Sequence, residues 1–94
     1  MESNEIKPNE TSPDTGVTTL DQITPPGACR VVMVPARGPI RQRLLAFGFV
    51  PGATIEAVRS APLGDPVEYK VKGYFLSLRK EEARLISVIP GSTS

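Results

Sequence analysis

Short apolar runs separated by turn residues make up most of the chain. The run Cys29–Val34 is rich in β-branched residues, and Thr54–Arg59, Tyr74–Leu78 and Leu85–Ile89 are further short segments of strand-like composition. Val67–Lys72 alternates apolar and charged residues with a period of two, which predicts a strand with one buried face. Short strands punctuated by proline and glycine predict an all-β fold, a small and strongly curved barrel.

One short helix is predicted between Pro39 and Gly48. Proline suits the first turn of a helix, and glycine suits the position just past its end. Ile40, Leu44 and Phe47 recur at helical spacing, so they are predicted to form a buried stripe. A helix of about two turns is not stable alone in water, and the stripe must therefore pack against the sheet.

The two ends of the chain differ in composition from its middle. Residues 1–18 contain one basic and four acidic side chains, a net charge of −3, and few apolar ones, which predicts a disordered acidic tail. Residues 19–94 contain ten basic and six acidic side chains, a net charge of +4. Within them we expect a folded domain at 19–89 and a flexible C-terminus at 90–94.

The composition argues against a catalyst. The 94 residues include no histidine, which excludes a Ser-His-Asp triad, a Cys-His pair and an imidazole metal cluster. The single cysteine, Cys29, cannot form an internal disulfide, as is usual in a reducing compartment. The N-terminus lacks the basic opening and the apolar stretch of a secretory signal. No apolar run reaches the roughly 18 residues that a membrane span needs. We therefore expect a cytoplasmic binding domain that is not an enzyme.

Three segments together resemble a known family. Arg41–Gly52 (RQRLLAFGFVPG), Ala61–Pro66 (APLGDP) and Leu76–Ala83 (LSLRKEEA) are similar to three signatures of the ferrous iron transport protein A (FeoA) family. They occur in the family's order and at its spacing, so the resemblance covers about residues 19–89. The acidic tail lies outside the pattern.

The resemblance implies a fold and a role. The fold would be an SH3-like β-barrel with the helix inserted after the first strand. The role would be that of a cytoplasmic accessory protein in bacterial ferrous iron uptake. Its partner would be the membrane iron transporter that carries a cytoplasmic GTPase domain, with no insertion of the chain itself into the membrane. Similar modules occur in metal-dependent repressors, so a metal-responsive regulatory or nucleic-acid accessory domain is the alternative.

Two features are candidate partner contacts. Leu45 lies about 140° around the helix from Ile40, so it is either covered by a second side of the barrel or is an exposed apolar contact beside Arg41. The second feature is a loop with two prolines, which either stiffens a connection through an Asp side-chain cap or offers a leucine to a partner. Its candidate residues are Pro62, Leu63, Gly64, Asp65 and Pro66.

No intrinsic cofactor or iron site is predicted. Cys29 opens an apolar strand and is interpreted as a small buried side chain. Arg79–Arg84 is predicted to form a single helical turn, on which Glu81 and Glu82 diverge and cannot chelate one ion well. Surface carboxylates therefore leave open only a weak divalent-metal contact that bridges two molecules, and with it a weak homodimer. The basic residues are interrupted by acids and are interpreted as solvated surface, not as a nucleic-acid track. They are Arg37, Arg41, Arg43, Lys70, Lys72, Arg79 and Lys80.

Overall fold

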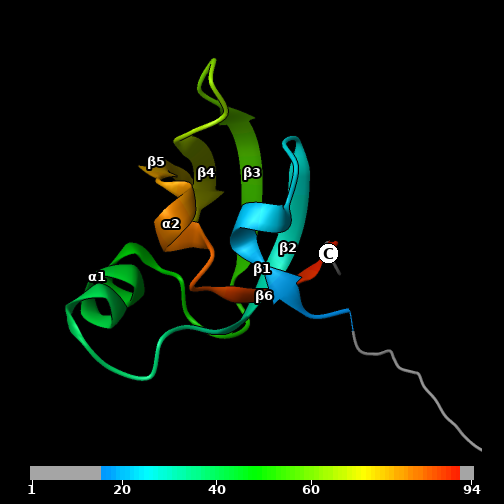
Figure 1. Cartoon of the computed structure of the whole chain (residues 1–94). Coiled ribbons are helices and arrows are strands. Elements are labelled where there is room, and N and C mark those ends of the chain that lie inside the picture. Colours follow the sequence, from blue (N-terminus) through cyan, green and yellow to red (C-terminus); the bar gives the residue numbers. More distant parts are fainter. Residues whose placement is uncertain (1–15, 92–94) are drawn as a thin grey trace, which may run out of the picture.

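A single six-stranded antiparallel sheet organises the chain, in the order β1-β6-β2-β3-β4-β5. A computed structural model describes residues 16–91. The strands are β1 (Thr18–Thr19), β2 (Gly27–Met33), β3 (Thr54–Ser60), β4 (Val67–Val71), β5 (Tyr74–Leu78) and β6 (Ser87–Pro90). The helices are the 3-10 helix η1 (Leu20–Gln22) and the α-helices α1 (Pro39–Phe47) and α2 (Lys80–Ala83). Figure 1 shows the sheet curling around a core, with α1 inserted after β2. This arrangement confirms the predicted all-β fold with one short inserted helix.

The first strand and η1 were not predicted. Thr18 and Thr19 pair with Val88 and Ser87 of β6, and Leu20 is fully buried behind them. A two-residue strand is too short to show a period, so the sequence contains no signal for it. The sheet thus begins at Thr18, the last residue of the predicted tail. Residues 1–15 of that tail lie outside the described residues, as do 92–94 of the predicted flexible C-terminus.

The last strand is shorter than predicted. It begins at Ser87, whereas the apolar run begins at Leu85. The backbone N–H of Leu85 donates to the carbonyl of Glu82 at 3.1 Å, and that of Ile86 donates to Ala83 at 3.1 Å. These bonds continue the turn of α2 by two residues. The side chain of Leu85 is consequently exposed, while Ile86 is buried.

Helix α1 ends as predicted but buries less than predicted. Gly48 has a φ of 104° and donates its N–H to the carbonyl of Leu45 at 3.0 Å, a left-handed helix cap. Of the predicted stripe, Leu44 is fully buried, whereas Ile40 and Phe47 are only partly buried against the core. All three residues of the predicted stripe thus pack against the core, but only Leu44 is completely covered, because the short helix meets the barrel mainly through its middle.

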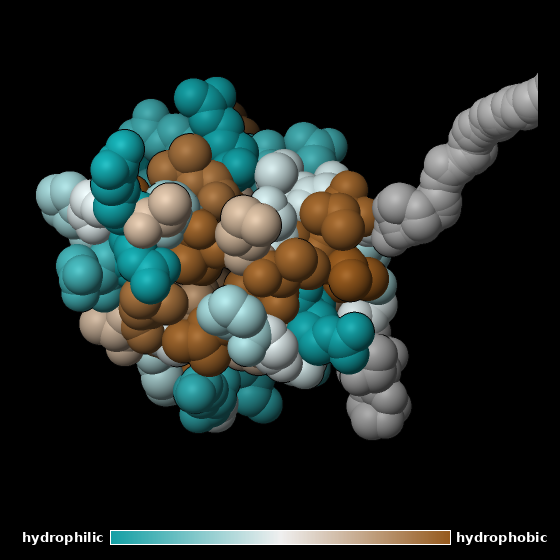
Figure 2. Space-filling model, turned by 90° about the horizontal axis from the view of Figure 1, so that it is seen from below, coloured by the Kyte–Doolittle hydropathy of each residue, from teal (hydrophilic) through white to brown (hydrophobic). Residues whose placement is uncertain are grey.

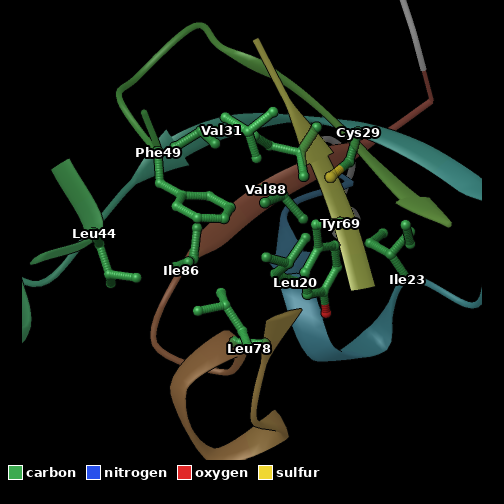
Figure 3. Packing of buried hydrophobic residues seen from close by; sticks show 14 of the residues in the cluster. Leu20, Ile23, Cys29, Val31, Leu44, Phe49, Tyr69, Leu78, Ile86 and Val88 are labelled. Carbon is green, nitrogen blue, oxygen red and sulfur yellow. The ribbon is translucent and has the colours of Figure 1, made fainter. Parts of the chain in front are cut away.

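The core gathers apolar side chains from the strands, η1 and the region around α1. Val67, Tyr69 and Val71 point inward, as the alternation in β4 predicted. Figure 3 shows Phe49, which follows α1, directed into the cluster beside Ile86. Phe49 and Tyr69 are its two largest fully buried side chains. The buried hydroxyl of Tyr69 has no hydrogen-bond partner among the described residues, which lowers the free energy of unfolding.

Cys29 has no exposed surface, which confirms its interpretation as a buried side chain. Burial raises the pKa of its thiol from 9.0 to about 11. We expect thiol reagents to modify Cys29 in the native protein far more slowly than in denaturant, with the rate followed by absorbance or mass. Because the folded pKa is raised, the thiol contributes stability that is complete below pH 9.0 and is lost as the pH rises toward about 11. Equal rates in native and unfolded protein would contradict this burial.

Candidate partner-binding surface

The loop between β3 and β4 projects from one end of the barrel, at the top of Figure 1. The N–H of Gly64 donates to the carbonyl of Ala61 at 2.7 Å, which places Pro62 and Leu63 at the corner of a turn. The N–H of Ala61 donates to the carbonyl of Pro66 at 2.9 Å and closes the base of the loop. Leu63 at the corner is 97% exposed, so this side chain has no packing role.

Asp65 braces the loop against α2. Its Oδ1 accepts the backbone N–H of Lys80, the first residue of α2, at 2.9 Å. The side-chain cap considered from the sequence therefore exists, but it caps a helix 15 residues away and not the loop itself. Leu63 is consequently held out from the barrel on a backbone fixed at both its base and its flank.

A second set of contacts joins α2 to α1. Glu82 accepts the backbone N–H of Arg79 through Oε1 at 3.2 Å and forms an ion pair through Oε2 with Arg43 of α1. The guanidinium of Arg43 lies 5.7 Å from the ring centroid of Phe47. The sequence interpretation treated Arg43 only as solvated surface charge. In the structure Arg43 links α1 to α2 through Glu82. Helix α2 is linked in turn to the loop through Asp65.

Leu45 is not an exposed contact. Its side chain is partly buried and packs against the core, which favours the reading that the barrel covers α1 on a second side. Arg41 donates from Nη1 to the carbonyl of Pro35 at 3.4 Å, a weak contact within the segment leading into α1. In Figure 1 the loop bearing Leu63 and helix α1 lie at different ends of the molecule. The structure thus does not bring Leu45 and Leu63 together.

Beside the loop lies a shallow hollow of about 430 Å³ that sequence reasoning missed. Arg59 and Glu68 form an ion pair there, with Nε and Oε1 2.8 Å apart. These two side chains come from neighbouring strands and meet only because β3 and β4 pair in this register. Strict alternation in β3 would place Arg59 on the same face as Ile55 and Ala57, and the register shift between Ala57 and Arg59 brings it opposite Glu68. The sequence therefore contained no signal for this pair. The hollow is lined by Arg59, Ser60, Ala61, Pro62, Pro66, Glu68 and Ser77.

Apolar side chains are also exposed elsewhere on the described surface. Figure 2 shows apolar residues gathered on the face seen from below, and Val17, Met33 and Leu85 are among the exposed apolar side chains. Within residues 16–91, no three His, Cys, Asp or Glu side chains are grouped as metal ligands. No helix in the described part of the chain is long and apolar enough to span a membrane.

The model of the FeoA domain matches residues 18–90, nearly the whole described structure. The chain therefore belongs to the FeoA family. A fusion of Fe(2+) transport protein A with Fe(2+) transporter FeoB from Porphyromonas gingivalis is 50% identical over 58 residues. That match takes in 62% of this chain but only 7% of the fusion protein.

Solved structures agree with this assignment. Iron(II) transport protein A from Clostridium thermocellum has a TM-score of 0.73 at 38% identity, covering 78% of this chain and 45% of that one. A FeoA-like protein from Clostridium acetobutylicum reaches 0.77 at 30% identity and covers 86% and 94%. FeoA of Stenotrophomonas maltophilia, described as an SH3 domain protein, is 29% identical with a TM-score of 0.67, covering 76% and 88%. The manganese regulator SloR, 15% identical over 79% of this chain and 34% of its own, shares the fold alone, with a TM-score of 0.68. The predicted family and the SH3-like fold are thus confirmed.

Proposed function

We propose that this chain is a non-enzymatic adaptor that binds the cytoplasmic part of a membrane ferrous iron transporter and modulates transport. The observation that carries this proposal is Leu63, which is 97% exposed on a loop braced by Asp65. Removal of a large exposed apolar side chain from water by a partner lowers the free energy and therefore favours binding. Because the backbone is already fixed, little conformational entropy is lost on binding.

The P. gingivalis relative supports the identity of the partner. Its description joins transport protein A and the transporter FeoB in one polypeptide. Two modules joined in one polypeptide are held next to each other, so the relative supports a transporter of that kind as the partner of this chain. The transporter is expected to supply the GTPase domain and the iron pathway.

The alternative is a regulatory or nucleic-acid accessory domain, like the module of metal-dependent repressors. The likeness to SloR is a likeness of fold alone and does not favour this role. Two of the basic residues, Arg43 and Arg59, are already paired with carboxylates. A phosphate-binding surface would lose affinity steeply as salt rises, whereas an apolar contact would not. Transporter binding measured over a range of salt concentrations therefore separates the two roles.

Leu63→Glu is expected to weaken binding to the intact, detergent-solubilised transporter tenfold or more, about 1.4 kcal/mol. Its free energy of unfolding should change by less than about 0.5 kcal/mol, because the native side chain is in water. Met33→Glu is the matched control, since it adds the same charge at another exposed apolar side chain, on β2. A folded Leu63→Glu variant that binds like wild type would refute the proposed contact.

A further inference from the structure

Strand β5 is an edge strand with unused backbone groups. It stands last in the sheet order, and among residues 16–91 it pairs only with β4. The two strands are joined by Lys72 and Gly73, with φ of 52° and 89°, the conformation of a two-residue hairpin turn. In such a hairpin the residues that flank the turn, Val71 and Tyr74, exchange both backbone hydrogen bonds.

The alternation of the ladder then fixes which groups are free. Leu76 and Leu78 bond to β4 as Tyr74 does, whereas Phe75 and Ser77 direct their N–H and C=O groups away from it. No other described residue bonds to these four groups. Both residues are exposed, Phe75 to 55%. The edge therefore offers two donors and two acceptors in the geometry of a strand.

The usual protections of an edge strand are weak here. β5 contains no proline and no charged residue, and its register with β4 has no bulge. The Lys70 ammonium lies over the Phe75 ring, 6.0 Å from its centroid. An unprotected edge with an exposed aromatic side chain is the template used in recognition by strand addition.

The end of β5 lies at the same end of the barrel as the loop. Ser77 lines the hollow together with Pro62, the neighbour of Leu63. Leu78 pairs with Val67, the first residue of β4 after the loop. A segment added along the free edge of β5 would therefore end at the end of the barrel that carries Leu63.

We propose that an extended segment of the transporter's cytoplasmic part adds to β5 as a further strand, resting on the adaptor function proposed above. Its backbone would bond to Phe75 and Ser77, and an apolar side chain would cover the Phe75 ring. An acidic side chain would complement Lys70, which has no ion pair with a described residue, whereas Glu68 is already paired with Arg59. A second copy of this chain fits less well, because its own β5 contains no acidic residue that could meet Lys70.

Ser77→Pro tests the backbone bonds. Proline removes the outward N–H of Ser77, which takes no part in the pairing with β4, and edge strands tolerate proline at such a position. Ser77→Ala is the matched control, because it removes the hydroxyl but keeps the N–H. With the intact transporter in detergent as the probe, Ser77→Pro should bind at least tenfold more weakly than wild type. Ser77→Ala should bind like wild type.

Amide hydrogen exchange of the wild-type chain gives a readout that does not depend on folding of a variant. In the free chain the amides of Phe75 and Ser77 should exchange fast and those of Leu76 and Leu78 slowly. Added transporter should slow Phe75 and Ser77 while leaving the other two unchanged. Full binding with no new protection at Phe75 and Ser77 would overturn strand addition and leave the adaptor proposal standing.

Two further outcomes would also count against the proposal. If wild type does not bind the transporter at all, both proposals fail together. If Phe75 and Ser77 become protected in the free chain as its concentration rises, a second copy occupies the edge and the proposed occupant is wrong. Should Ser77→Pro fail to fold, the exchange of the wild-type amides decides alone.

Discussion

Phe49→Ala is expected to lower the free energy of unfolding by about 3–5 kcal/mol. The ring has no exposed surface and is among the largest side chains in the core. Figure 3 shows it filling the space next to Ile86, at the point where the chain leaves α1 for the barrel. Removal of the ring would lose its transfer free energy and leave a cavity that the surrounding strands cannot close. Denaturant unfolding with an unchanged m-value would measure the loss.

Phe47→Ala provides the comparison, because it deletes the same ring two residues earlier. Phe47 is only partly buried, and part of its contact is with the exposed Arg43 guanidinium. We expect this variant to lose less than half as much stability as Phe49→Ala. If the two variants lost equal stability, or Phe47→Ala lost more, the inward placement of Phe49 would be wrong.

These two phenylalanines show what the sequence could not supply. The helical period correctly identified Leu44, but it also included Phe47, because a period describes a helix face and not how far that face meets the sheet. Phe49 stands beyond the capping Gly48, in a segment with no period at all. Its burial follows from the path of the chain after the cap, where its N–H donates to the carbonyl of Leu44 at 3.0 Å.

Strand β4 shows the opposite case. Its alternation alone predicted the inward positions of Val67, Tyr69 and Val71, because each buried face of a strand repeats every second residue. The alternation could not identify the partner strands. The ion pair of Arg59 with Glu68 and the hollow around it depend on register, and register depends on the whole sheet.

The candidate site divides in the same way. Leu63 could be singled out from its own loop, since prolines on either side hold a short surface turn and a leucine there has nothing to pack against. Leu45 could not be assigned, because a two-turn helix on a small barrel can be covered on two sides, and the structure shows that it is. The Tyr74–Leu78 strand was predicted from the sequence, but its position at the edge of the sheet could not be predicted without the strand order.

Gly48→Ala is expected to lower the free energy of unfolding by about 2–3 kcal/mol, from two separate causes. An L-residue in the left-handed region costs roughly 1–2 kcal/mol, and Gly48 has a φ of 104°. An added Cβ would also lie 3.0 Å from Cγ1 of Val71, a fully buried side chain that can yield little, and such overpacking adds its own cost. Gly52→Ala separates the causes, because Gly52 has a φ of 91° but no atom lies within 4 Å of the place that its added Cβ would take. It should lose only the conformational part, about 1 kcal/mol. Thermal or denaturant unfolding of both variants measures the difference, and equal losses would show that the Val71 contact relaxes without cost.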